Sequence, residues 1–194
     1  MIHFDLDARQ INNLITELGL TERQAKFALG RALRRTAATL RKRSERGLMT
    51  MLQMKKLAYL RRRLKFSRFS KGTFEGARLW YGANDVPISA LKGTIEKDGK
   101  GASFSGAAGS FSYPGGFVGK SKRGWTKGGK TIFTRAGAAR LPIREAQLPV
   151  KERMDIFVED EIFPQIEDIF WNHFQRDMTA RARYGVGNRN DRFS

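Results

Sequence analysis

Residues 21–47 read TERQAKFALGRALRRTAATLRKRSERG, and this stretch decides how the N-terminal part of the chain folds. Apolar and small side chains recur in it at spacings of three and four, the period of one face of an α-helix. Thr21 and Gln24 form a capping-box pair, in which each side chain satisfies a backbone N–H group at the helix start. The pattern predicts a helix to about Gly47 with an alanine-rich face that permits close approach of another helix. The residues of that face are Ala25, Ala28, Leu29, Ala32, Leu33, Thr36, Ala37 and Leu40.

The opposite side of this helix is crowded with positive charge, and so is a second helical stretch predicted at about residues 50–64. Almost no acidic side chain lies four residues from these cations, so they repel one another unless an anion neutralises them. A solvated helix face is the ordinary interpretation of a charge run, but the missing acidic partners favour contact with a polyanion or an acidic protein. The candidate contact residues are Arg31, Arg34, Arg35, Arg41, Lys42, Arg46, Lys55, Lys56, Arg61, Arg62, Arg63 and Lys65.

The charge of the whole chain shows the same asymmetry. Its 194 residues include 37 Lys or Arg and 19 Asp or Glu, which gives a net charge of +18. Residues 21–71 carry a net +15, whereas residues 1–20 and residues 151–194 each carry −2. Such a concentration indicates that one face of the protein contacts a polyanion, because charge that serves solubility alone would be spread more evenly.

Composition disfavours several classes of protein. The chain has no cysteine and only two histidines, and no serine lies in a nucleophile elbow, so we expect no enzyme, no cofactor and no metal site. An apolar fraction of 40% with 14 Phe is too high for a disordered basic tail. No run approaches the roughly 20 apolar residues of a membrane span, and the first residues lack the pattern of a secretion signal. We therefore expect a protein used in the cytoplasm or in a particle assembled there.

The middle of the chain has the texture of β-structure. Residues 74–81 and 86–91 predict a hairpin with its turn at residues 83–85. Residues 99–137 contain 11 of the 20 glycines and predict short strands joined by long loops, with the clearest strand at residues 130–135. Aromatic residues alternate with basic ones here and could stack nucleic-acid bases, but the inner face of a small sheet is their commoner place. We assign Phe74, Trp80 and Phe133 to the core and leave Phe111, Tyr113 and Trp125 open as loop-tip contacts.

The predicted fold is α+β, with N-terminal basic helices, a small antiparallel sheet with long glycine-rich loops, and a long C-terminal amphipathic helix. A short helix that ends at Gly19 precedes the basic helix. The C-terminal helix covers about residues 151–180, and Pro164 must kink or divide it. We expect a single domain over residues 1–180, with a helical basic part (1–65), a β-rich part (66–148) and the C-terminal helix (149–180), followed by a flexible polar tail (181–194).

One sequence motif has to be rejected. Residues 124–131, GWTKGGKT, match the phosphate-loop pattern G-x-x-x-x-G-K-[ST]. A phosphate loop needs a buried strand before it and a helix that begins at its Lys-Thr pair. Here a polar loop precedes the match and a strand follows it, so we interpret the match as chance.

Two clusters of titratable residues have equally plain interpretations. His3, Asp5 and Asp7 resemble a small metal cluster, but the same spacing is an acidic lead-in to the first helix, where the helix dipole favours negative charge. His173 and Asp177 lie one helical turn apart on the C-terminal helix. We interpret them as part of a solvated helix face or as partner contacts.

Two short motifs in the middle of the chain carry a family resemblance. P-G-G-F stands at residues 114–117, and F-x-R-x-G-x-x-R-L-P-I stands at residues 133–143. With the alanine-rich helix before them and the amphipathic helix after them, they resemble the minor tail protein Z, or tail completion, family of tailed bacteriophages over nearly the whole chain. The motif residues are Pro114, Gly115, Phe117, Arg135, Gly137, Arg140, Pro142 and Ile143.

The resemblance implies a structural virion protein of the tail or neck, assembled in the host cytoplasm and needed for head–tail joining and DNA passage. Proteins of this region commonly form rings around the DNA path. The expected partners are therefore other copies of the chain in a ring, expected to be hexameric, and neighbouring tail terminator, tail tube or head–tail connector proteins. Double-stranded DNA in the channel is a further candidate partner, and no membrane is expected. The alternative is a non-viral basic nucleic-acid-binding protein that acts through phosphate contacts.

Overall fold

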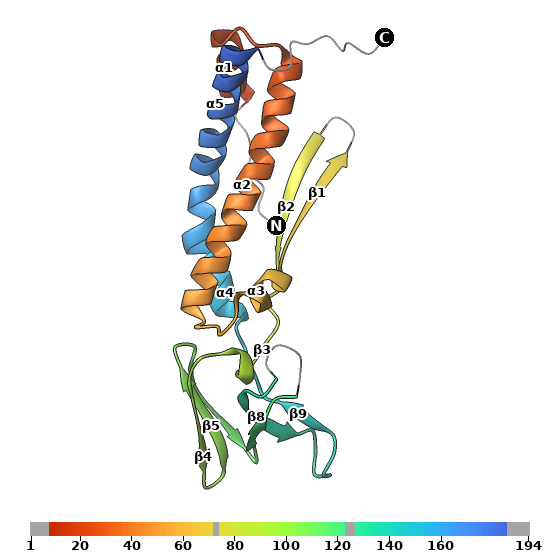
Figure 1. Ribbon diagram of the computed structural model, residues 1–194, viewed down its shortest axis with the longest axis vertical. Helices are drawn as coiled ribbons and strands as arrows, with labels where there is room; N and C mark the ends of the chain where they lie inside the picture. Colours follow the sequence, from red (N-terminus) through yellow and green to blue (C-terminus); the bar gives the residue numbers. More distant parts are fainter. Residues whose placement is uncertain (1–7, 72–73, 123–126, 186–194) are drawn as a thin grey trace. The chain divides into compact units, whose positions relative to one another are not determined.

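The computed structural model describes residues 8–71, 74–122 and 127–185 (Figure 1). The predicted α+β class is confirmed, with a long C-terminal helix and several small antiparallel sheets. The chain forms two compact units, each built from segments that are not contiguous in the sequence. The helical unit comprises residues 1–43, 66–80 and 159–194, and the sheet unit comprises residues 44–65 and 81–158. That the two units act as one domain stays a prediction.

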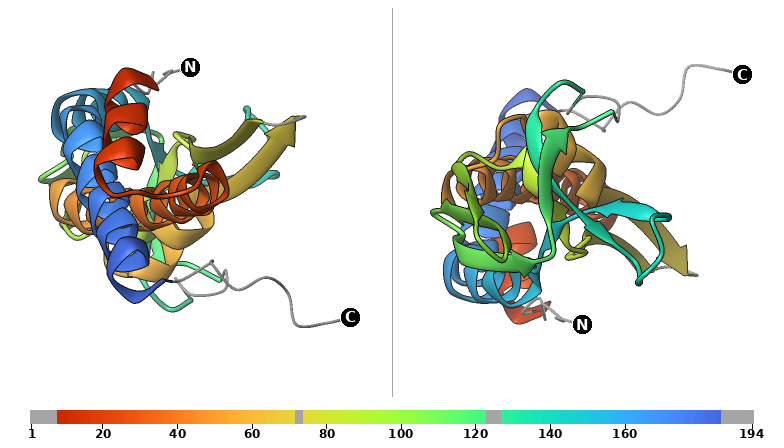
Figure 2. Two further views of the ribbon diagram at one scale, coloured as in Figure 1. Left: turned by 90° about the horizontal axis from the view of Figure 1, so that it is seen from above. Right: turned by 90° about the horizontal axis from the view of Figure 1, so that it is seen from below.

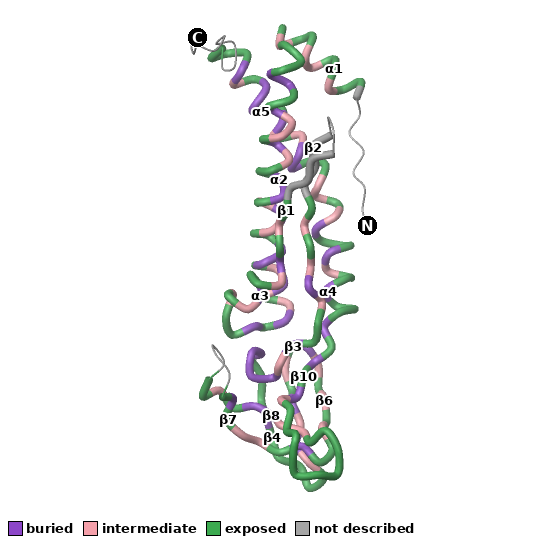
Figure 3. The backbone as a smooth tube through the Cα atoms, turned by 90° about the vertical axis from the view of Figure 1, so that its right-hand side faces the viewer, coloured by how far each residue is buried: buried purple, intermediate pink, exposed green. Residues whose placement is uncertain are grey.

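Three helices form the core of the helical unit. The first part of α2 (Glu22–Met51) runs beside α5 (Ile166–Tyr184), and α1 (Ala8–Glu17) lies at the end of the pair where α2 begins (Figures 1 and 2). Buried and exposed residues alternate along both long helices, as amphipathic sequences require (Figure 3). The predicted alanine face of α2 is buried because its small side chains make room for aromatic rings of α5. The buried cluster is Ala25, Ala28, Ala32, Phe170, Phe174 and Met178.

The start of α2 confirms the predicted capping box. The backbone N–H of Thr21 donates to Oε1 of Gln24 at 2.9 Å, and the backbone N–H of Gln24 donates to the Thr21 hydroxyl at 3.3 Å. Gly19, at φ +59°, makes the left-handed turn that ends the first helix. These local signals therefore fix the boundary between α1 and α2.

The predicted boundary between the second and third helices is wrong. α2 continues through Gly47 to Met51, and the next helix, α3 (Leu57–Arg63), begins only after a turn. Gly47 stays inside the helix because the ring of Phe157 occupies the place of a side chain: a Cβ on Gly47 would lie 2.2 Å from Phe157 Cζ. The turn follows at Gln53, whose φ is +46°.

The predicted hairpin of residues 74–91 is also wrong. β2 (Phe74–Tyr81) pairs with β1 (Leu64–Lys71), whereas β3 (Val86–Pro87) pairs antiparallel with β10 (Gln147–Leu148). Residues after β3 form a short 3-10 helix, η1 (Ile88–Ala90), all of which is buried. The run at residues 86–91 is mostly apolar and does not alternate with polar residues. Such a run indicates a buried strand but does not indicate which other strand it pairs with.

Two three-stranded antiparallel sheets complete the sheet unit. One has the order β4-β5-β6 and the other β7-β8-β9. The predicted strand at residues 130–135 is confirmed as β8. The strands are β4 (Thr94–Asp98), β5 (Gly101–Gly106), β6 (Gly109–Pro114), β7 (Phe117–Lys120), β8 (Lys130–Arg135) and β9 (Ile143–Glu145).

The aromatic residues divide differently from the prediction. Trp80 is 49% exposed, so its assignment to the core is wrong. Its strand belongs to a sheet of only two strands, which is too small to enclose a core of its own. Phe133 is half-buried, and Phe111 and Tyr113 pack against the sheet-unit core instead of standing at loop tips. The side chain of Phe74 and the whole of Trp125 lie outside the described residues.

The C-terminal helix is divided near Pro164, as predicted. α4 (Lys151–Phe157) passes into a π-helical turn, η3 (Val158–Ile162), and then a 3-10 turn, η4 (Phe163–Gln165), before α5 begins. A proline ring cannot continue an α-helical hydrogen-bond ladder, which explains the interruption. α5 extends to Tyr184, past the predicted end at residue 180, and Gly185 closes it at φ +60°. The rest of the predicted polar tail, residues 186–194, lies outside the described residues.

Candidate nucleic-acid interface

The exposed side of α2 in the helical unit carries part of the predicted basic surface. Arg31, Arg34, Arg35 and Lys42 are all exposed, whereas Arg41 is half-buried. Positions 31, 35 and 42 are separated by four and seven residues, which places them on one side of the helix. A polyanion could therefore contact several of these cations at once through its phosphates.

Two of these arginines also serve the fold, because they flank a buried carboxylate. Asp177 of α5 has a side chain only 6% exposed, and its Oδ1 lies 3.4 Å from Arg31 and 4.0 Å from Arg35. Its Oδ2 accepts a hydrogen bond of 2.7 Å from Nε of Arg181, which is buried to the same extent. The interpretation of Asp177 as part of a solvated helix face is therefore wrong, and so is the placement of Arg181 in a flexible tail.

His173 sits beside this ion-pair cluster. Its Nε2 lies 3.2 Å from the hydroxyl of Thr39 on α2. Partial burial, together with the positive charges of Arg35 and Arg176, lowers the pKa of His173 below its usual 6.5. The imidazole therefore remains neutral to lower pH than a free histidine does.

The basic residues of the sheet unit fall into two groups. Arg46, Lys55, Lys56, Arg61, Arg62 and Lys65 are exposed. Arg61 forms an ion pair of 3.4 Å with the largely buried carboxylate of Glu45, one of the few acidic residues in this part of the sequence. Of the others, Arg46 lies on the last part of α2, Lys55 and Lys56 lie just before α3, Arg62 lies on α3, and Lys65 follows it.

Arg63 differs from its neighbours because it holds a loop in place. Its guanidinium donates to the carbonyl oxygens of Gly82 at 3.3 Å, of Asp85 at 2.8 Å and of Asn84. It also donates to the hydroxyl of Tyr59 and lies 4.6 Å from the centroid of that ring. These bonds occupy the planar donor fork that would bind a phosphate, so we assign Arg63 to the structure of the sheet unit.

The described part of the rejected phosphate-loop match, residues 127–131, is a turn followed by a strand. Its last two residues, Lys130 and Thr131, begin strand β8 and no helix. Lys130 Nζ donates to the carbonyl oxygen of Ile95 at 2.8 Å, and the buried Thr131 hydroxyl donates to Glu145 at 2.8 Å. The two side chains that would bind phosphate and metal in a true loop are thus engaged elsewhere. Gly124 to Thr126 lie outside the described residues.

The two family-motif segments meet in the sheet β7-β8-β9. The register places Phe117 opposite Phe133 and Arg135 opposite Ile143. The rings of Phe117 and Phe133 stack with centroids 5.8 Å apart. Phe117 is 37% exposed and Ile143 is 41% exposed, so this sheet presents apolar side chains to solvent beside the exposed Arg135. Of the other motif residues, Gly115 takes the turn after β6 at φ +68°, and Pro114, Gly137, Arg140 and Pro142 are exposed.

Comparisons with protein-family models, with curated proteins and with solved structures found no match to this chain. Among the residues that the structure describes, no three His, Cys, Asp or Glu side chains could together hold a metal ion. His3, Asp5 and Asp7 lie outside that part of the chain. No described helix has both the length and the apolar character needed to cross a membrane.

Proposed function

We propose that the protein is a structural, non-catalytic component of a tailed-bacteriophage virion, acting in tail completion at the head-proximal end of the tail or in the neck. The observation that carries the proposal is the sheet β7-β8-β9. Its strands carry residues of both motif segments, which 15 residues separate in the sequence, and together they present the stacked pair Phe117 and Phe133 with Ile143. An exposed apolar surface of this kind is typical of a subunit that assembles with neighbours.

The partners follow from this role. Copies of the chain assemble as a ring around the DNA path, expected to be hexameric, and the ring adjoins tail terminator, tail tube or head–tail connector proteins. The exposed cations of α2 and of the segment around α3 meet double-stranded DNA in the channel or an acidic face of a neighbouring ring. In either case they contact charge without reading sequence.

A non-viral nucleic-acid-binding protein is the second candidate, and the exposed basic residues of α2 favour it equally. The two functions differ in the size of the protein in solution. Ring-sized species in sedimentation velocity or native mass spectrometry support the virion role. A monomer at every concentration that binds nucleic acid tightly would overturn it.

The nature of the polyanion is tested by binding to duplex DNA at low and at physiological salt. Contact with about six phosphates predicts that affinity falls roughly 10³-fold between 50 and 200 mM salt. The double variant Lys42→Glu/Arg46→Glu should reduce both the affinity and the salt dependence. The control is Lys97→Glu/Lys100→Glu, which makes the same charge change on exposed residues of the β4–β5 hairpin. Absence of binding at any salt would leave an acidic protein as the partner.

A further inference from the structure

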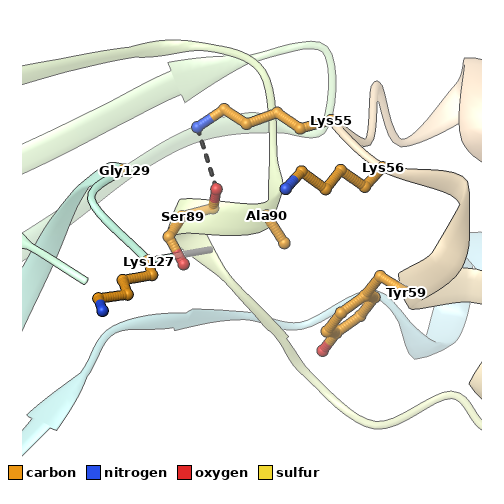
Figure 4. A pocket seen from close by; sticks show the side chains of 7 residues that line it. All are labelled: Lys55, Lys56, Tyr59, Ser89, Ala90, Lys127 and Gly129. Atoms are coloured by element: carbon orange, nitrogen blue, oxygen red, sulfur yellow. Dashed lines mark hydrogen bonds between the residues drawn. The ribbon is translucent and has the colours of Figure 1, made fainter. Parts of the chain in front are cut away.

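The sheet unit contains a pocket that joins two residues of the predicted basic surface, Lys55 and Lys56, to residues that were not predicted to be functional. It has a volume of about 200 Å³ (Figure 4). Its described lining comes from three separate segments: the connection from α2 into the start of α3, the short helix η1, and residues 127–129 just before β8. The lining residues are Lys55, Lys56, Tyr59, Ser89, Ala90, Lys127 and Gly129.

Backbone hydrogen bonds hold the first two segments together. The N–H of Lys55 donates to the carbonyl oxygen of Ala90 at 2.9 Å, and the N–H of Lys92 donates to the carbonyl oxygen of Gln53 at 2.8 Å. The Lys55 side chain then folds back, and its Nζ donates to the carbonyl oxygen of Ser89 at 3.0 Å. This wall of the pocket is therefore preorganised by the fold.

The lysines converge on the pocket from two sides. Figure 4 shows the ammonium groups of Lys55 and Lys56 on one side, above Ser89 and Ala90. The stem of Lys127 lies on the opposite side, with its ammonium group directed away from the other two. The long stem of Lys127 can rotate, so this ammonium group can also reach an anion in the pocket.

Three lysines line the pocket, and the carboxylate of Glu145 acts on one of them, Lys55. Oε1 of Glu145 already accepts hydrogen bonds from the backbone N–H of Ser89 at 3.3 Å and from the Thr131 hydroxyl at 2.8 Å. Burial lowers the pKa of Lys55, and the attraction of Glu145 offsets this only in part. An anion in the pocket would stabilise the charged form of Lys55.

Ser89 supplies an independent sign of a missing ligand. The residue is 2% exposed, and its hydroxyl is buried without a hydrogen-bond partner among the described residues. Buried hydroxyl groups are nearly always hydrogen-bonded, because leaving one unsatisfied costs free energy. A ligand oxygen in the pocket would give this hydroxyl an acceptor.

We propose that this pocket binds a phosphate group, either inorganic phosphate or a phosphate monoester. Lysine ammonium groups bind phosphate as point charges, and three of them match the several charged oxygens of a phosphate better than the two of a carboxylate. Gly128, at φ +81°, and Gly129 allow the loop backbone to approach the ligand closely. The site uses Lys127 from the phosphate-loop lookalike, but not Lys130, and so differs in construction from a phosphate loop. It does not rest on the proposed virion function.

The test is titration of the full-length protein with inorganic phosphate and with glycerol 3-phosphate, by calorimetry at low salt. Binding by the unmodified protein is expected, and Lys55→Gln/Lys56→Gln should weaken it at least tenfold. The control Lys97→Gln/Lys100→Gln removes two exposed lysines of the same unit and should change the affinity less than twofold. A dissociation constant above about 10 mM for the unmodified protein, or equal losses in the two double variants, would overturn the proposal.

Ser89→Ala separates ligand binding from a purely structural role. Removing an unsatisfied buried hydroxyl should leave thermal stability unchanged or raise it. The same substitution should weaken phosphate binding about threefold, because a hydrogen bond to the ligand is lost. A short DNA duplex serves as a competitor of phosphate. If the duplex displaces phosphate from the unmodified protein and no longer binds to Lys55→Gln/Lys56→Gln, the pocket belongs to a nucleic-acid surface. The assignment to a small phosphate ligand is then wrong.

Discussion

Replacing Asp177 with alanine should destabilise the helical unit more than any surface substitution on α5. The carboxylate is 6% exposed and lies 2.7 Å from the equally buried Nε of Arg181. Removing one partner of such a pair leaves an uncompensated charge, which costs about 3–5 kcal/mol. Arg31 and Arg35 are 46% and 51% exposed, so each loses at most about 1 kcal/mol when it turns to water.

The assay is urea unfolding followed by circular dichroism, with Asp168→Ala as the matched control. Asp168 is an exposed carboxylate on the same helix, so its removal should change the free energy of unfolding by less than about 0.5 kcal/mol. The double variant Asp177→Leu/Arg181→Met should recover most of the stability, because apolar side chains of similar size replace the pair. If Asp177→Ala costs less than 1 kcal/mol, or the double variant is as unstable as the single one, then the ion pair does not hold α5 as reasoned.

Two further predictions concern groups that the sequence alone did not distinguish. Arg63→Gln should lower the free energy of unfolding by about 2 kcal/mol, because its charged hydrogen bonds to the loop at residues 82–85 are lost. The control Arg62→Gln, on the same helix, should change that free energy little. Equal losses for the two variants in denaturant titrations would contradict the role of Arg63 in holding the loop. His173 has a lowered pKa in the folded protein, so the unfolded chain binds more protons as pH falls below about 6.5, and stability should decrease from pH 7.5 to pH 5.5. His173→Gln should reduce the change of stability with pH, measured by thermal melts of both proteins over the same pH range. If stability changes with pH equally in the two proteins, other titratable groups cause the change.

The sequence alone was sufficient to predict a helix boundary where the residues that form it are close together in the sequence. Thr21 and Gln24 bond to each other, so their spacing alone predicts the start of α2. Pro164 likewise carries its own steric rule and predicts the break before α5. Elements of this kind depend on a few consecutive residues, and no tertiary contact overrides them here.

Prediction failed where a distant part of the chain decides the outcome. Gly47 would end a helix in isolation, but the ring of Phe157 packs where a side chain would be, so the helix continues past it. Val86 and Pro87 pair with residues of β10, about sixty positions away, and nothing local selects that partner. The pocket residues Lys127 and Ser89 were missed for the same reason.

The burial of Asp177 did have a signal that could have been used. Asp177 follows Phe174 by three residues, and Arg181 follows Met178 by three, so the two charged residues lie on the apolar side of α5. A carboxylate and a guanidinium one turn apart on such a side predict a buried pair, because neither is tolerated there alone. Spacing relative to the apolar side, and not charge alone, separates this pair from the exposed cations of α2.

The discontinuity of the helical unit has a consequence for how the chain is made. Phe170 and Phe174, which cover Ala25, Ala28 and Ala32, leave the ribosome only after about 140 further residues have been made. Until then the apolar side of α2 has no native cover, and closing so long a loop slows folding. The residues of the sheet unit, in contrast, are complete by Val158. Vectorial synthesis therefore favours the sheet unit folding first, and a nascent chain released before α5 would expose an uncovered basic, amphipathic helix to aggregation or to chaperones.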